Sequence, residues 1–137
     1  MIDFGNGYWY FATPYSHPDE RVREYRFEMA CEGAARLLEA GINVYCPIAH
    51  THPISEHLGN LPHEFWMRVD HPFLVDALGL IIGMLPGWSD SRGVMEEMRR
   101  TLDAEKPISY LPGPPFADTI ELFATPELAR ASLEATT

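Results

Sequence analysis

Apolar residues along the chain follow two patterns: short continuous runs, and spacings of three or four positions. The aromatic run from Tyr8 to Thr13 predicts a buried first strand. Residues 18–20 suit the first turn of a helix, and apolar side chains then recur at helical spacing as far as Ala40. Gly41 is placed to end that helix, because glycine adopts the left-handed C-terminal conformation without strain.

The middle of the chain is less regular. Residues 42–48 (INVYCPI) predict a second short strand, which the proline stops. Residues 49–62 contain proline, glycine and histidine without periodicity, and they predict a loop that is unusually long for a small domain. Residues 63–70 look helical, and we expect Pro72 to break or restart that helix, which would end near residues 76–77.

Residues 78–85 (LGLIIGML) form the clearest strand, because continuous apolar runs are typical of parallel sheets covered on both faces. Three further elements are predicted, a helix, a strand and a final helix, at 91–105, 106–111 and 126–135. The order β-α-β-loop-α-β-α-β-α predicts an α/β fold: a single-domain, doubly wound (Rossmann- or flavodoxin-like), mainly parallel sheet flanked by helices. Such sheets bind ligands at the carboxyl ends of their strands, so we expect a site near the loops after Thr13, Pro47 and Leu85.

Composition and charge narrow the classes of partner. Apolar residues make up 46% and charged residues 22%, an ordinary globular balance. The formal net charge is −10 and no basic cluster is larger than Arg99–Arg100, which argues against a nucleic-acid polymer but allows one small anionic ligand. No apolar run approaches membrane-spanning length. Cys31 and Cys46 lack CxxC spacing and no secretory pattern is visible, so we expect reduced thiols and a cytoplasmic protein.

The helix predicted at 91–105 carries two adjacent acids, Glu96 and Glu97. Three arginines lie three or four positions from Glu96: Arg92, Arg99 and Arg100. They favour a surface ion-pair role for Glu96. Glu97 lies one turn after Gly93, which leaves space beside the carboxylate, and Ser91 at the helix start suits a cap or a ligand contact. The pattern S-x-G-x-x-x-E after the most buried strand makes Glu97 a functional candidate.

Several motifs in order resemble the nucleoside 2-deoxyribosyltransferase superfamily. They are YFATPYS on the first strand, the aspartate of WMRVD, the apolar strand, S-x-G-x-x-x-E, and KPI. The superfamily includes deoxyribosyltransferases, 2′-deoxynucleoside 5′-phosphate N-hydrolases and CMP-hydrolase-like enzymes. The chain looks most like a bacterial and phage group with ATPYS and LPGW-x-x-S-x-G motifs. The resemblance spans residues 8–111 of a single domain, 1–137, and leaves the tail 112–137 unassigned.

The resemblance implies a retaining cleavage of an N-glycosidic bond without a cofactor. Glu97 matches the nucleophile that forms a covalent glycosyl intermediate, Asp70 the second carboxylate near sugar and leaving base, and Tyr10 the tyrosine that orients the nucleophile. Without the resemblance, the favoured interpretation is that Tyr10 is a core aromatic and that Asp70 merely precedes a proline-initiated helix. Related enzymes borrow residues from a neighbouring subunit at the C-terminal end, so we expect a homo-oligomer.

The substrate is a small nucleoside or nucleotide in this interpretation. Deoxyribosyltransferases resemble D-x-G-x-x-x-E, with the aspartate meeting the sugar hydroxyl, whereas the nucleotide hydrolases have serine there. Ser91 therefore favours a nucleoside 5′-monophosphate, although Asp90 is adjacent and could replace the aspartate. Besides Ser91, Asp90 and Gly93, the substrate-binding candidates are two phosphate contacts, Ser16 and Arg23, and two aromatic residues, Tyr15 and Trp88. Arg23 could instead pair with Glu20, and either aromatic could be structural packing.

Two other functions remain open. Five histidines cluster around the predicted loop: His50, His52, His57, His63 and His71. They allow a metal-dependent hydrolase, but no HExxH or similar spacing is present and a solvated or substrate-gating loop is favoured, so we expect no metal. A non-catalytic nucleotide sensor on the same fold would need many of the same contacts. Hydrolysis and transfer differ only in whether water or a second base reaches the intermediate.

Overall fold

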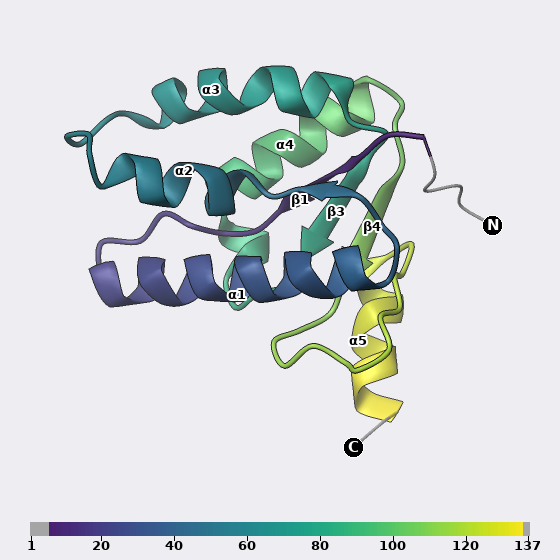
Figure 1. Ribbon diagram of the computed structural model, residues 1–137. Coiled ribbons are helices and arrows are strands. Elements are labelled where there is room, and N and C mark those ends of the chain that lie inside the picture. The colour runs from purple at the N-terminus through teal and green to yellow at the C-terminus, as the bar shows by residue number, and fades with distance from the viewer. Residues whose placement is uncertain (1–5, 136–137) are drawn as a thin grey trace.

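The computed structural model describes residues 6–135 of the chain. Its sheet has four strands, all parallel, in the order β2-β1-β3-β4. The strands are β1 (Trp9–Ala12), β2 (Val44–Tyr45), β3 (Leu80–Gly83) and β4 (Ile108–Leu111). The predicted α/β fold with a parallel sheet is therefore confirmed (Figure 1).

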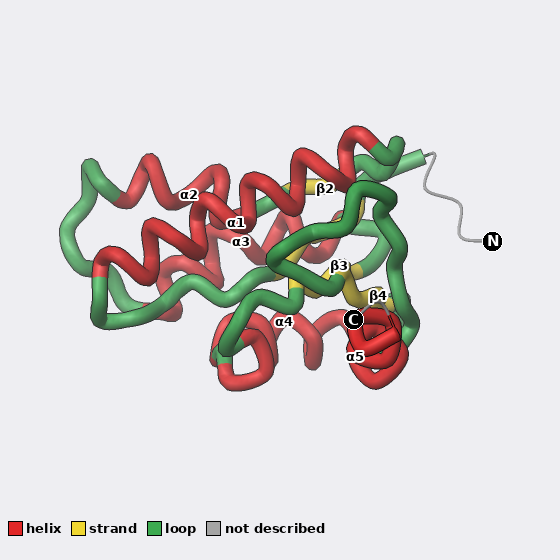
Figure 2. Tube along the Cα trace, turned by 90° about the horizontal axis from the view of Figure 1, so that it is seen from below, coloured by secondary structure: helices red, strands yellow, loops and turns green. Residues whose placement is uncertain are grey.

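Five helices connect and follow the strands. They are α1 (Glu20–Glu39), α2 (Pro47–Ser55), α3 (His63–Asp76), α4 (Arg92–Asp103) and α5 (Pro126–Ala135). A short 3₁₀ helix, η1 (Trp88–Asp90), lies between β3 and α4. In Figure 2, α1 lies on one side of the strands, and α4 and α5 lie on the other. The molecule has the three-layer arrangement that crossover connections between parallel strands produce.

The alternation of side chains along β1 divides the core into two halves. Trp9 and Phe11 face α1 and pack against Leu37. Tyr10 and Ala12 point to the opposite face, into the core shared with α3, α4 and α5. In this second half of the core, Tyr10 of β1 therefore lies on the side of α4, the helix that carries the two glutamates.

The loop predicted at 49–62 is wrong over its first half, because α2 occupies residues 47–55. Pro47 stands in the first turn, where its missing N–H costs no helical hydrogen bond. Pro47, Thr51 and His52 share the face that the helix buries. The helix is stabilised by packing and not by a regular apolar pattern, and Pro53 within it disguised the periodicity.

The break predicted at Pro72 is also wrong, because α3 runs continuously through it to Asp76. Pro72 is exposed, so the backbone carbonyl that its ring deprives of a partner can be solvated. Other predicted boundaries hold: α3 ends at Asp76, and Gly41 follows α1 with φ of 86°, the conformation for which glycine is suited.

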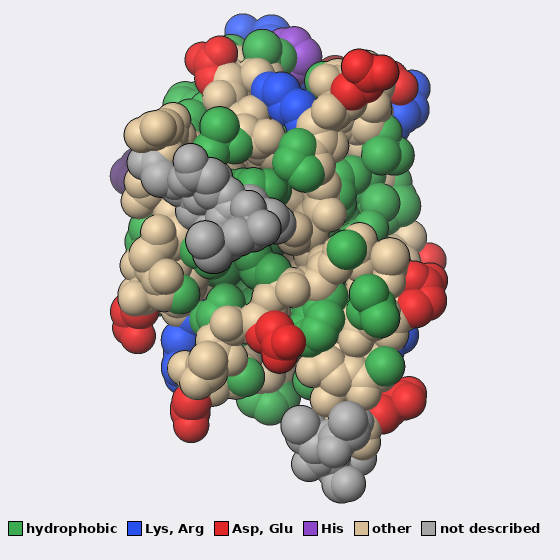
Figure 3. Space-filling model, turned by 90° about the vertical axis from the view of Figure 1, so that its right-hand side faces the viewer, with side chains coloured by type: hydrophobic (Ala, Val, Ile, Leu, Met, Phe, Trp, Pro, Cys, Tyr) green, Lys and Arg blue, Asp and Glu red, His purple; other side chains and the backbone are tan. Residues whose placement is uncertain are grey.

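The surface is mixed in character. Figure 3 shows one side of the molecule, with hydrophobic side chains distributed over this face and charged groups mostly, but not all, near its margin. Among residues 6–135, none of the helices combines the length and the apolar character needed to cross a bilayer.

Candidate active site

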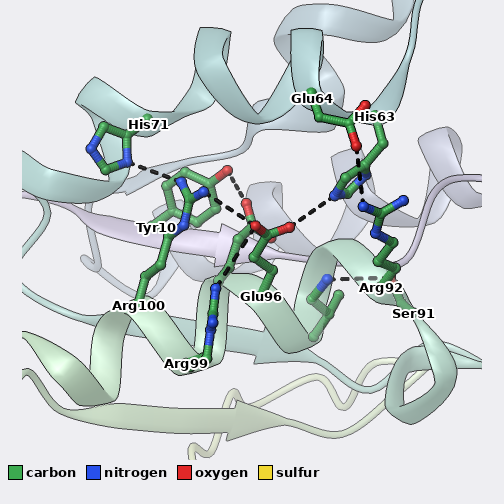
Figure 4. Close-up of polar contacts among 11 residues, drawn as sticks. Tyr10, His63, Glu64, His71, Ser91, Arg92, Glu96, Arg99 and Arg100 are labelled. Atoms are coloured by element: carbon green, nitrogen blue, oxygen red, sulfur yellow. Dashed lines mark hydrogen bonds and ion pairs between the residues drawn. The ribbon is translucent and has the colours of Figure 1, made fainter.

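The side chains of Tyr10 and Glu97 meet beneath the sheet. Tyr10 lies within β1 and is fully buried, and Glu97 comes from the inner face of α4 with only 6% of its surface exposed. The Tyr10 hydroxyl donates a hydrogen bond to Oε2 of Glu97 (Figure 4). Burial of a carboxyl group without a paired cation is unfavourable, so this arrangement is poorly explained as a stability device.

Burial controls the protonation of the pair. It raises the pKa of Glu97 to about 8, an effect that the hydrogen bond from Tyr10 opposes and the nearby Asp70 carboxylate reinforces. Burial, followed by the charge of Glu97, also raises the pKa of Tyr10 well above its usual range. Tyr10 therefore remains a neutral donor, and Glu97 releases its proton near neutral to mildly alkaline pH.

Asp70 on α3 is the second carboxyl of the site. Burial raises its pKa to about 6. Its Oδ1 atom is buried and has no hydrogen-bond partner within the described part of the chain. Its charge acts on Tyr10, Glu97 and Tyr45, which places all four groups in one electrostatic neighbourhood. An orphaned buried oxygen of this kind is a potential contact for a ligand.

Sequence reasoning missed Tyr45. Its hydroxyl is buried and also lacks a hydrogen-bond partner among the residues described. Its ring stacks on Phe73 with a centroid distance of 4.3 Å and is tilted toward Tyr10 at 6.0 Å. Burial, followed by the charge of Asp70, raises the pKa of Tyr45 to about 12, so it is a neutral donor. The available signal was cross-strand register, since Tyr10 and Tyr45 are partners once β1 and β2 are paired.

The amino end of α4 matches the sequence expectation for a cap. Ser91 caps the helix, and its Oγ accepts a hydrogen bond from the Val94 N–H at 3.3 Å. A side chain added at Gly93 would meet only that oxygen, at 3.9 Å, so the space that the sequence predicted beside the helix is present. Asp90 is exposed on η1. The proton of the Ser91 hydroxyl remains available for donation.

Glu96, one residue before Glu97, faces the other way. Its carboxylate lies 2.9 Å from His63 Nε2, 3.2 Å from Arg100 and 3.9 Å from Arg99. The hydrogen bond from His63, more than the arginines, lowers the pKa of Glu96. The expected pairing with Arg92 is wrong, because that guanidinium reaches across to Glu64 of α3 at 3.2 Å (Figure 4).

A groove of about 500 Å³ runs between α3 and α4. Its lining includes Glu96 with its partners His63 and Arg100, but not Tyr10, Asp70 or Glu97. His71 bridges the two helices at 3.0 Å from Arg100 (Figure 4). A ligand that occupies this groove would therefore contact Glu96 and its partners and not the Tyr10, Asp70 and Glu97 cluster.

The remaining predicted contacts are dispersed. Tyr15 hydrogen-bonds to His52 Nδ1 at 2.6 Å. Arg23 donates to the His17 carbonyl, so the alternative pairing with Glu20 is wrong. Ser16 is exposed, and its carbonyl accepts from Arg26. The ring of Trp88 packs edge-on against Tyr110 at 5.8 Å, with the Arg130 guanidinium 6.0 Å above it. The structure shows packing contacts for Trp88 and does not join Ser16 or Arg23 to the Glu97 cluster.

Fold and site together define a class of protein: a parallel α/β protein in which a buried glutamate accepts a hydrogen bond from a tyrosine of a central strand and lies near a partly buried aspartate. Residues 7–112 match the model of a family described as a domain of unknown function, DUF1937, and the chain belongs to this family. Comparison with curated proteins gives no match.

Proposed function

We propose that the protein cleaves the N-glycosidic bond of a (deoxy)nucleoside or its 5′-monophosphate through a covalent ester between the sugar and Glu97. The observation that carries this proposal is the buried hydrogen bond from Tyr10 to Glu97 beside the second acid, Asp70. The parallel α/β fold is compatible with the nucleoside 2-deoxyribosyltransferase-like superfamily, to which the sequence motifs point.

The proposed reaction has two displacements. Ionised Glu97 attacks the anomeric carbon while the bond to the base breaks, and Asp70 gives its proton to the departing nitrogen. A water molecule or a second base then attacks the same carbon, Asp70 takes up the proton, and the Glu97 carboxylate is released. Tyr10 holds the nucleophile in place and favours its charged form, because the hydrogen bond that it donates is stronger to a carboxylate than to a carboxylic acid.

The protonation of the two acids governs when this sequence can begin. The pKa values of Asp70 and Glu97 are raised to about 6 and about 8, so the pair holds a single proton across neutral pH, and Glu97 holds it most of the time. The first displacement requires the other arrangement, with Glu97 ionised and Asp70 protonated, so only a minor fraction of the free protein is in the reactive form and substrate binding must favour that form. Activity is expected to pass through a maximum in this range and to fall when the pair is fully protonated or fully ionised.

The contacts to the substrate follow from the unpaired groups. We assign the sugar and base to the buried oxygens of Asp70 and Tyr45, which a ligand would provide with partners. We assign a 5′-phosphate to the start of α4, where free N–H groups and the Ser91 hydroxyl favour an anion. Exposed Asp90 is the alternative contact if the 5′ group is a free hydroxyl, and Gly93 leaves room for either.

Base release tests the proposal. The full chain is incubated with a panel of ribo- and deoxyribonucleosides and their 5′-monophosphates, and free base is separated by chromatography. Addition of a different free base reveals transfer as an exchanged nucleoside or nucleotide. Release from at least one compound supports the proposal, and release from none overturns it.

Two alternatives give different results in the same assay. A nucleotide sensor binds a panel member in calorimetry but releases no base. A metal-dependent hydrolase loses base release on chelation and keeps it when Glu97 is replaced by glutamine. The proposed enzyme does the reverse.

We also propose a homo-oligomer, on the resemblance alone. Light scattering coupled to size exclusion tests it. A monomer at assay concentrations would require the single chain to supply the complete site.

A further inference from the structure

A second polar cluster lies between α1 and α2. His52 is buried with 8% of its surface exposed, and it projects its Nε2 atom toward two glutamates. That nitrogen lies 2.8 Å from Oε2 of Glu24 on α1 and 3.8 Å from Oε1 of Glu56, the residue after the last turn of α2. The three ligand atoms all lie within 4.8 Å of one another. One imidazole and two carboxylates therefore converge on a single point.

The imidazole is held in a fixed orientation. Its Nδ1 atom is hydrogen-bonded to the Tyr15 hydroxyl at 2.6 Å. Its ring stacks on Phe27 with a centroid distance of 4.2 Å and an interplanar angle of 25°. Histidines that bind metals have this arrangement: one nitrogen carries the ion, and the other donates to an oxygen that fixes the ring and its tautomer.

The charge of the cluster favours a cation. Among residues 6–135, no lysine or arginine pairs with Glu24 or Glu56, and His52 is the partner of both. A protonated imidazole would neutralise only one of the two carboxylates. A divalent ion bound to the neutral imidazole neutralises both, and the ligands then need no further counter-charge.

We propose that Glu24, His52 and Glu56 bind a divalent transition-metal ion of the zinc type. Zinc accepts mixed nitrogen and oxygen ligands at about 2.0–2.2 Å, which separates the ligand atoms of a tetrahedral site by roughly 3.3 Å. The two separations from Nε2, 2.8 and 3.8 Å, bracket that value. The glutamate side chains are 50% and 67% exposed, so they can adjust, and water can complete the coordination.

The ion would join three segments of the chain: α1, α2 and the segment after β1 that carries Tyr15. It would lie apart from the acids on the other face of the sheet, and it supplies no step of the proposed glycosidic reaction. The inference therefore does not rest on the proposed function. It gives the histidine-rich region a binding role that its sequence spacing does not reveal.

Metal binding to the chelator-treated full chain tests the site. Calorimetry with Zn²⁺ is expected to give one ion per chain, and Co²⁺ is expected to produce the visible absorption of a low-coordinate site. Glu24→Gln and Glu56→Gln should each weaken Zn²⁺ binding at least tenfold. The matched control is His57→Ala, an exposed histidine of the same region, and it should leave the affinity unchanged.

Thermal unfolding separates loss of the site from loss of the fold. Zn²⁺ should raise the melting temperature of the wild type and have less effect on the two glutamine variants, whose melting temperatures without metal should remain close to that of the wild type. Tyr15→Phe should also weaken binding, by less than the ligand substitutions. The proposal is overturned if no ion binds with 1:1 stoichiometry, or if both glutamine variants bind Zn²⁺ as the wild type does.

Discussion

Glu96 and Glu97 are the same residue type at adjacent positions of α4, and they have opposite environments. Glu96 faces the groove between α3 and α4, where His63 and Arg100 stabilise its charge and lower its pKa. Glu97 faces the sheet, where burial raises its pKa to about 8. A rotation of about 100° per residue separates a stabilising ion pair from a buried acid. On this helix the environment, and not the residue type, separates a carboxylate with a lowered pKa from one with a raised pKa.

Activity should separate the two glutamates by the largest margin. Glu97→Gln removes the attacking oxygen but preserves shape, so kcat/KM for base release should fall by roughly 10³-fold or more. Glu96→Gln removes only a groove ion pair and should change kcat/KM by no more than a few-fold. Equal losses of kcat/KM in the two variants would show that the different environments of Glu96 and Glu97 have no effect on catalysis.

At high pH, replacing Glu97 and replacing Glu96 should change the free energy of unfolding in opposite directions. The folded-state pKa of Glu97 lies above its ordinary value of 4.5, so its contribution is fully present below that value and is lost as pH rises through about 8. At pH 9, Glu97→Gln should therefore raise the free energy of unfolding, by on the order of 3–5 kcal/mol if the whole shift is realised.

The pKa of Glu96 is lowered by its partners, so its contribution has the opposite dependence: present above the ordinary pKa and lost as pH falls below it. Glu96→Gln should destabilise the protein at pH 9. Urea denaturation of both variants at pH 5 and pH 9 measures the two slopes. A Glu97→Gln protein that is less stable than wild type at pH 9 would contradict the account of burial.

Tyr10 should set the position of the alkaline limb of the pH–rate profile, because that limb reports the higher of the two pKa values, which belongs to Glu97. The hydrogen bond from its hydroxyl lowers the pKa of Glu97, so Tyr10→Phe should move that limb to higher pH and reduce kcat/KM by roughly 10- to 100-fold at neutral pH. Tyr8→Phe is the control, because that hydroxyl bonds to the Phe73 carbonyl and not to an acid. A uniform loss of rate with an unshifted limb would assign Tyr10 to packing alone.

Substitution of Gly93 should have the smallest effect, and it should change activity and stability in opposite directions. A methyl group there would meet only Ser91 Oγ, at 3.9 Å, so Gly93→Ala should stabilise α4 by about 0.5–1 kcal/mol. If the sugar occupies that space, kcat/KM should fall as the melting temperature rises. An alanine variant with undiminished activity would show that the ligand lies elsewhere.

Much of the fold and part of the candidate site could be predicted from the sequence. Continuous apolar runs mark β1 and β3, because both faces of a central parallel strand are covered. The order of the motifs predicted that Tyr10 and Glu97, which are 87 positions apart, belong to one site. The structure joins them by a hydrogen bond. The predicted ligand loops were less informative, since Tyr10 lies within its strand and not in the loop after it.

The remainder depended on tertiary packing. The helix α2 has no clear amphipathic pattern and contains Pro53, so its packing against α1 could not be read locally. Tyr45 enters the site through strand pairing, and Glu24 reaches His52 across 28 positions. Helical spacing predicted that Arg92 pairs with Glu96, but Arg92 pairs with Glu64 on the neighbouring helix α3. The spacing of residues within one segment does not reveal such contacts, because they join segments that are distant in the sequence.

The most direct test of the central claim is a search for the covalent intermediate. Wild-type protein is mixed with a substrate identified by base release, quenched in acid, digested and mapped by mass spectrometry. The account predicts a mass increase of one glycosyl group on the peptide that contains Glu97, present in Glu96→Gln and absent in Glu97→Gln. A glycosyl group found on another residue, or base release that persists at the wild-type rate in Glu97→Gln, would contradict it.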